Sequence, residues 1–153
     1  MHDREEIEFI KKFIQDNPNA DIVLGSDSQR MKKKRVKFAV VVIIHYRDAD
    51  GIGKGAKVFS DITYETVKDG KLSKPFNRMM REVTLLTEVY NELEDVLIER
   101  DFSIHIDVNP DPEAGSNVAY GAAKGMIWGI CGVEPVTKPH AWGASTAADR
   151  FSK

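Results

Sequence analysis

Hydrophobic and polar positions follow two different periods along this chain, and the changes of period divide it into elements. Residues 3–16 carry apolar side chains every three or four positions, which predicts an amphipathic N-terminal helix. Residues 21–27 form a short apolar run, and residues 36–46 are apolar and β-branched almost throughout. With the alternating residues 56–65 they predict three strands, the second covered on both faces. Because the connections are short, we expect an antiparallel meander.

The second half of the chain predicts helices alternating with strands. Residues 76–100 repeat apolar side chains at the spacing of a long amphipathic helix, and residues 102–108 predict a fourth strand. A helix is expected over 117–130, a short fifth strand over 134–138 and a last helix over 145–151. The order is β-β-β-α-β-α-β-α after an extra leading helix, which predicts an α/β fold with a mixed sheet.

Two local signals refine the helix expected over residues 117–130. Ser116 precedes it and is a suitable N-cap. Gly121, Gly125 and Gly129 share one ridge of that helix, since they are four residues apart. We therefore expect this ridge to sit close against the sheet.

Length and composition are typical of one globular domain. The 153 residues predict a single domain over 1–153, with residues 1–19 as an N-terminal helical extension. No apolar run approaches the ~18 residues of a membrane span, and the first six residues include four charged ones where a secretory signal is apolar. We therefore expect a cytoplasmic location. The single cysteine, Cys131, has apolar neighbours and is interpreted as a buried thiol.

The net charge of the chain is only weak evidence for or against a nucleic-acid partner. A net charge of −2 is unlike that of a strongly basic nucleic-acid binder. One cationic segment nevertheless stands out, and Lys32, Lys33, Lys34 and Arg35 within it are candidate phosphate contacts. A solvated hairpin turn explains the same charges equally well.

Two aspartates occupy matching positions in the predicted sheet. Asp27 follows the apolar run of its strand, and Asp107 follows Ile104-His105-Ile106 in the same way. If the two strands are neighbours, these carboxylates converge. Each alone is more often the start of a turn, but the pair favours a functional site.

Helical phase distinguishes two glutamates of the long helix. Glu82 lies about 60° from the centre of the apolar stripe, whereas Glu88 lies roughly opposite that stripe. We therefore expect Glu82 to border the buried face and Glu88 to lie in water. A glutamate at the flank of a helix that reaches out to solvent is the alternative for Glu82.

A fourth acid, Asp149, lies among small residues that permit close approach of the last helix to the sheet. An exposed acid paired with Arg150 is the simpler interpretation of this segment alone. Clustered carboxylates repel one another and are costly to bury, and a divalent cation removes both problems. Mg²⁺ and Mn²⁺ prefer oxygen ligands, and three or four acids can hold two such ions ~4 Å apart.

The chain resembles the ribonuclease H-like fold, and over residues 20 to 153 it is similar to the YkuK-like family of that superfamily. The resemblance rests on the element order and on several short motifs. They are Gly25-Ser26-Asp27-Ser28, Asn77-Arg78-Met79-Met80-Arg81-Glu82, Ile106-Asp107-Val108, and Lys138-Pro139-His140-Ala141-Trp142 followed by Asp149.

The resemblance implies a mixed five-stranded sheet with its first three strands antiparallel, flanked by helices. It implies that Asp27, Glu82, Asp107 and Asp149 are the catalytic and metal-binding acids. It also implies a proton-transfer or product-release role for His140. The chain departs from ribonuclease H where Asn109-Pro110-Asp111-Pro112-Glu113 follows the third acid, which leaves Asp111 and Glu113 as further candidates. No basic insertion follows the long helix, so substrate preference does not transfer.

Three functions are compatible with these residues. The main hypothesis is a nuclease that uses two Mg²⁺ or Mn²⁺ ions on RNA, DNA or a hybrid. The alternative is a non-catalytic nucleic-acid-binding module of the same fold, against which all four acids argue, because a degenerate copy usually loses one. A nucleotide-binding phosphotransferase is disfavoured, because the glycines of residues 51–55 join strand to strand rather than strand to helix.

Overall fold

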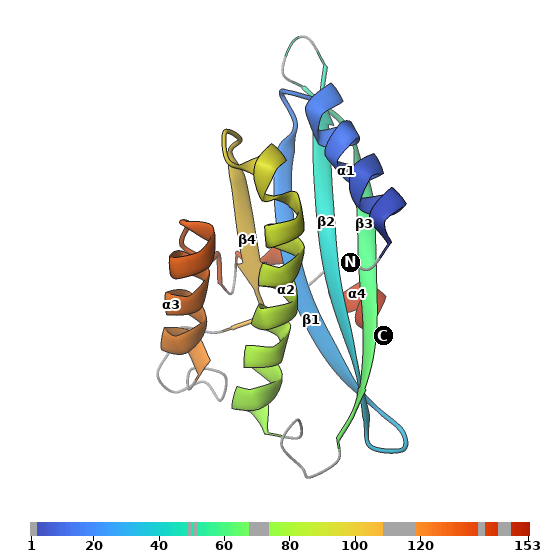
Figure 1. Cartoon of the computed structure of the whole chain (residues 1–153), viewed down its shortest axis with the longest axis vertical. Coiled ribbons are helices and arrows are strands. Elements are labelled where there is room, and N and C mark those ends of the chain that lie inside the picture. Colours follow the sequence, from blue (N-terminus) through green and yellow to red (C-terminus); the bar gives the residue numbers. More distant parts are fainter. Residues whose placement is uncertain are drawn as a thin grey trace.

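The structure is a computed structural model, and it describes residues 3–48, 50, 52–67, 74–108, 119–137, 140–143 and 148–153, apart from the side chain of Asp149. The elements, in chain order, are α1 (Arg4–Asp16), β1 (Asp21–Met31), β2 (Arg35–Arg47), β3 (Gly53–Thr66), α2 (Pro75–Leu97), β4 (Phe102–Ile106), α3 (Tyr120–Cys131) and α4 (Asp149–Ser152). Figure 1 shows how they are arranged. None of the described helices has the length and apolarity that crossing a bilayer requires.

The sheet has the order β3-β2-β1-β4. β1 pairs with β2 and β2 with β3 in antiparallel fashion, so the predicted meander is confirmed. β4 lies on the other side of β1 and runs parallel to it, with Ile22 opposite Phe102 and Ser26 opposite Ile106. The mixed sheet is therefore confirmed, and the first and fourth strands are neighbours.

The expected fifth strand is reduced to one bridge among the described residues. Val136 pairs with His105 in parallel fashion, and its N–H and C=O bond to Ile104 and Ile106 at 2.7 and 3.0 Å. The described sheet is therefore four-stranded rather than five-stranded. Pro135 directly precedes Val136 in the sequence. Because proline has no N–H to donate, Pro135 cannot extend the ladder as an ordinary strand residue would.

Side chains alternate between the two faces of the sheet and pack against different helices. One face carries Ile22, Leu24 and Ile104, which form the main core with α1, α2 and α3. The other face carries Val23, Val41 and Ile43, which form a smaller cluster with Ala148 and Phe151 at α4. Figure 1 accordingly shows α1 and α2 in front of the sheet and α4 behind it. β2 is thus covered on both faces, as its apolar sequence predicts.

The glycine ridge of α3 does not pack as expected. A Cβ added at Gly121, Gly125 or Gly129 would meet nothing within 4 Å, so this ridge faces open space. Ala123, Ile127 and Cys131 are buried instead, on the side of α3 that contacts α2. These three recur every four residues and offer apolar area to bury, which glycine does not. The proposed cap Ser116 lies outside the described residues.

The buried interpretation of Cys131 is confirmed. Burial, with a smaller contribution from Glu94, raises the pKa of its thiol to about 12. A thiol that stays protonated is a poor nucleophile.

Candidate functional site

Asp27 and Asp107 lie on neighbouring strands, one position beyond the last register pair, Ser26 and Ile106. Adjacent strands are about 4.8 Å apart, so the sheet brings the two backbone positions together. Asp27 lies inside β1 rather than at its end, because the polar residues after it continue the ladder with β2 as far as Met31. Asp27 is 7% exposed, and Asp107 is half-buried where β4 ends.

Asp27 faces the side of the sheet that α4 covers. The Ser152 hydroxyl, only 1% exposed, donates a hydrogen bond to Asp27 Oδ2 at 3.3 Å. Ser152 ends α4 and Asp149 begins it, so the last helix lies against the strand that holds Asp27. The side chain of Asp149, the expected fourth acid, lies outside the described residues. Asp111 and Glu113 also lie outside them.

Glu82 approaches the two aspartates from α2, on the opposite face of the sheet. It is 4% exposed, whereas Glu88 is exposed, so the predicted helical phase is confirmed. The Ser28 hydroxyl donates a hydrogen bond to Glu82 Oε2 at 2.9 Å. Glu82 Oε1 is buried and has no hydrogen-bond partner among the described residues. One oxygen of this carboxyl is thus held by the protein, while the other has lone pairs to offer a ligand.

The electrostatics of Glu82 show that the three acids interact. Burial, the charge of Asp27 and the charge of Asp107 together raise the pKa of Glu82 from 4.5 to about 8. The Ser28 hydrogen bond, which has a larger effect than the charge of Asp107, and the charge of Arg78 both lower the pKa, but the net shift is upward. A carboxyl of this kind is protonated at neutral pH until a cation replaces the proton.

The described acids alone do not complete a metal site. No three Asp, Glu, His or Cys side chains within the described ranges are close enough together to hold an ion. The residues nevertheless suit a hard cation, because the nearby donors are carboxylates and Glu82 Oε1 is a buried oxygen with an unused acceptor. Any complete set would need a further ligand, such as the side chain of Asp149, or a movement that brings these three acids together.

His140 is exposed and lies in a turn, where its N–H bonds to Thr137 O at 2.9 Å. The buried histidine is instead His105 on β4, which is 4% exposed and which sequence reasoning did not single out. Gly143 N–H donates to its Nδ1 at 2.9 Å, and Ser103 Oγ lies 3.3 Å from its Nε2. Its ring meets the Trp142 ring edge-on, with 5.1 Å between centroids. His105 thereby fastens the segment that precedes α4 to the sheet.

Burial lowers the pKa of His105 to about 4, so the ring is neutral at physiological pH. Because Nδ1 accepts the Gly143 hydrogen bond, the proton of the neutral ring is on Nε2. Only its place between Ile104 and Ile106 in an apolar strand could have indicated burial from the sequence. The residue holds structure beside the acids and is not itself among them.

The cationic segment forms the hairpin between β1 and β2. Lys33 and Lys34 have φ of 62° and 55°, a left-handed conformation that is unfavourable for residues with a side chain. The hairpin and the end of α4 line a cavity of about 530 Å³. Ser152 lines it too, so this cavity adjoins the residue that binds Asp27. Lys32, Lys33 and Arg35 line the same cavity.

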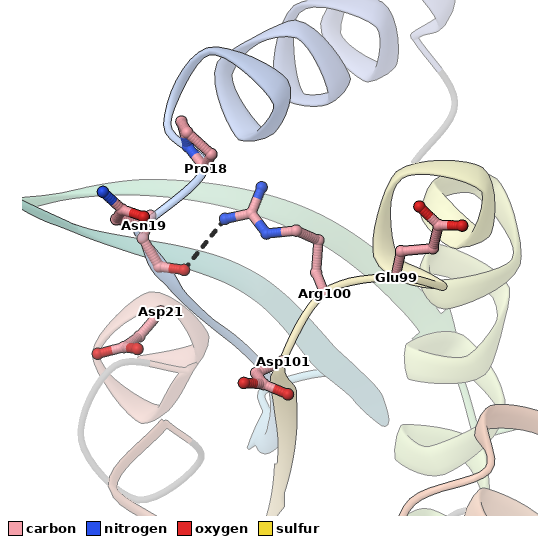
Figure 2. Close-up of a pocket in the computed structure, with 7 residues that line it drawn as sticks. Pro18, Asn19, Asp21, Glu99, Arg100 and Asp101 are labelled. Atoms are coloured by element: carbon pink, nitrogen blue, oxygen red, sulfur yellow. Dashed lines mark hydrogen bonds between the residues drawn. The ribbon is translucent and has the colours of Figure 1, made fainter.

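A separate cavity of about 340 Å³ lies at the other end of β1 and β4, beside Asp21 and Asp101. Arg100 donates hydrogen bonds there to the carbonyls of Ile14, Asn17 and Ala20, at 2.7 to 3.1 Å. Figure 2 shows its guanidinium turned toward the end of α1, away from Asp21 and Asp101. Ile14 and Asn17 lie at the C-terminal end of α1, and Ala20 lies in the turn between α1 and β1. The role of this arginine is therefore to join α1 to the turn before β4.

Comparison with known proteins gives one positive result. A family model described as ribonuclease H-like matches residues 5–153, nearly the whole chain. No curated protein and no solved structure matches the chain. The matched range includes all four candidate acids, His105, His140 and the cationic hairpin. The chain therefore belongs to the ribonuclease H-like family, and within it to the YkuK-like family that its motifs resemble.

Proposed function

We propose that this protein is a metal-dependent nuclease that cleaves phosphodiester bonds in RNA, DNA or a hybrid. The observation that supports it best is the buried Glu82 Oε1, which has no hydrogen-bond partner among the described residues and belongs to a carboxyl that interacts with Asp27 and Asp107. Burying such an oxygen without a partner costs about 1–3 kcal/mol, so it calls for a functional explanation. A cation is a suitable partner for it.

In this proposal Asp27, Glu82, Asp107 and Asp149 hold Mg²⁺ or Mn²⁺. Two such ions supply, when bound, an attacking water of lowered pKa and stabilisation of the leaving oxygen. Ser28 orients the Glu82 carboxyl through its hydrogen bond, and Ser152 orients Asp27 in the same way. His140, exposed in its turn, is available to transfer a proton or assist product release.

The nucleic acid is proposed to lie along the cavity beside the β1–β2 hairpin. Lys32, Lys33 and Arg35 line it and supply charge for phosphates, while Lys34 lies at the turn. Because Ser152 lines the same cavity, a strand held there would pass close to Asp27. Such contacts are largely independent of sequence.

The alternative is a nucleic-acid-binding module that keeps the fold without catalysis. The observation in its favour is that no three ligands within the described part of the chain are gathered around one point. In that case the hairpin would bind nucleic acid, and the protein would not cleave it.

A pair of aspartates at the two ends of β4 gives the sharpest test. Asp107 follows this strand at the candidate site, whereas Asp101 precedes it at the far end. The experiment measures cleavage of a panel of labelled RNA, DNA and hybrid oligonucleotides with Mn²⁺ or Mg²⁺, for the parent, D107N and D101N. We expect cleavage by the parent, a loss of about 10²-fold or more for D107N, and parental activity for D101N. Equal activity of D107N and the parent, or no cleavage by the parent, would favour the binding module.

A further inference from the structure

A second charged group lies beside the candidate acids, on the same helix as Glu82. Arg78 is four residues before Glu82 on α2, and residues at this spacing are neighbours on a helix surface. It is half-buried, and its charge lowers the pKa of Glu82. The guanidinium therefore lies within electrostatic range of the Glu82 carboxyl and is partly shielded from bulk water.

Arg81, almost one turn of α2 further on, has a different role. Its guanidinium forms an ion pair with Glu65 of β3, with Nε 2.6 Å from the Glu65 carboxylate. Arg78 has no such hydrogen bond or ion pair with any residue that the structure describes. Arg81 is thus paired with a carboxylate of the protein, whereas the five N–H donors of Arg78 are available to a ligand.

Helix stability does not explain Arg78. α2 begins at Pro75, so Arg78 lies in its first turn, at the positive end of the helix dipole. A cation is unfavourable there, and an acid is the stabilising choice, yet the first turn of α2 contains none. The position is one where an anion, not a cation, would be expected to bind.

We propose that Arg78 binds the phosphate of the nucleic-acid substrate next to the carboxylates, through a nonbridging oxygen. This inference rests on the proposed function and adds a residue that positions the phosphate. Carboxylates that are not fully neutralised by metal repel a phosphodiester, and a nearby cation on the approach side offsets that repulsion. Guanidinium suits this role, because its planar N–H groups match the oxygens of a phosphate.

The direction of the substrate follows from the fold. The first turns of α2 and the β1–β2 hairpin lie at the same end of the sheet (Figure 1). Arg78 would thus contact phosphate from the α2 side, and the hairpin lysines from the α4 side.

The experiment compares R78Q with R78K and with the matched control R81Q. Binding of a labelled single-stranded DNA oligonucleotide is measured at several salt concentrations in Ca²⁺, which also takes oxygen ligands. For R78Q we expect about 10-fold weaker binding and a log–log salt slope reduced by about 0.7, the value for one phosphate of a single strand. R78K should recover the slope but only part of the affinity, because it keeps the charge without the planar N–H groups. R81Q should bind like the parent.

Mn²⁺ affinity, measured by calorimetry without nucleic acid, separates the role of Arg78 from the metal site on which it depends. R78Q should bind Mn²⁺ as tightly as the parent or more tightly, since it loses a positive charge near the ion. Parental affinity and salt slope in R78Q, equal losses in R78Q and R81Q, or no nucleic-acid binding by the parent would each overturn the role of Arg78. A parent that binds no Mn²⁺ contradicts the proposed metal site instead.

Discussion

The Ser28 hydroxyl donates a hydrogen bond to Glu82 Oε2 at 2.9 Å, and this bond joins the first strand to the long helix. Ser28 directly follows Asp27 on β1, so one short stretch of strand supplies an acid and orients a second. The other oxygen of Glu82 has no hydrogen-bond partner among the described residues. The carboxyl is therefore fixed on one side and open on the other.

Removal of this hydroxyl should weaken metal binding without removing a ligand. The Ser28 hydrogen bond lowers the pKa of Glu82, so in S28A that pKa rises further and a proton competes better with the cation. We expect Mn²⁺ affinity near pH 7 to fall about 10-fold, as for other residues that orient a ligand. The check is calorimetric titration of S28A and S26A. Ser26 Oγ is buried without a partner among the described residues, so S26A should bind Mn²⁺ like the parent.

The raised pKa of Glu82 also predicts a pH dependence of stability. The folded protein holds this proton up to about pH 8, whereas the unfolded chain releases it near pH 4.5. The stability that protonated Glu82 contributes to the folded protein is therefore fully present below about pH 4.5 and is lost as the pH rises through about 8. Denaturant unfolding measures the free energy of unfolding of the metal-free parent and of E82Q. Between about pH 5 and pH 9 the stability of the parent should fall relative to that of E82Q. A constant difference over that range would show that Glu82 is not buried beside other charges.

Two glycines predict opposite effects of the same substitution. A Cβ at Gly143 would lie 2.9 Å from Val23 Cγ1 and 3.0 Å from His105 Nδ1, so G143A forces these groups apart. We expect a loss of about 1–3 kcal/mol in the free energy of unfolding. Gly125 lies in α3 facing open space, and G125A should gain about 0.5–1 kcal/mol. Urea unfolding of both variants measures this, and equal effects would contradict the described placement of residues 140–143.

The hairpin cations predict a salt-dependent effect on nucleic-acid binding. Changing Lys32, Lys33 and Lys34 together to Glu should weaken binding of a labelled oligonucleotide and flatten its salt dependence, by about 0.7–0.9 in slope for each phosphate that the variant no longer binds. The fold should persist, since glutamate is no less suited than lysine to the positive φ of the turn. Replacement of Lys12, which is exposed on α1, by Glu serves as a control. If the slope is the same in all three proteins, nucleic acid binds elsewhere or not at all.

Much of the fold could be predicted because periodicity is a strong local signal. The phase of α2 correctly separates Glu82 from Glu88, and the matching positions of Asp27 and Asp107 correctly indicate neighbouring strands. β1 is longer than its apolar run predicts, because its last polar residues form a strand only through pairing with β2. Local sequence does not contain that information.

Other features depend on tertiary contacts. The hydrogen bond from Gly143 to His105 joins residues that are 38 positions apart in the chain. The hydrogen bond from Ser152 to Asp27 joins residues that are 125 positions apart. The prediction that the glycine ridge of α3 is buried is wrong, because spacing alone does not decide which of two ridges faces the protein. The roles of the four acids and of His140 stay predictions that rest on the sequence and on the proposed function.

The metal site itself is tested most directly by calorimetric titration of Mn²⁺ into the parent, E82Q and E88Q near neutral pH. Glu82 and Glu88 lie on one helix with the same chemistry, and only Glu82 is buried beside Asp27 and Asp107. The parent should bind Mn²⁺ with release of about one proton, seen as a binding enthalpy that depends on the buffer, because the cation displaces the proton of Glu82. E88Q should reproduce this result, whereas E82Q should bind Mn²⁺ about 10-fold or more weakly and release no proton. Parental Mn²⁺ affinity and proton release in E82Q would contradict the proposed role of Glu82 as a metal ligand.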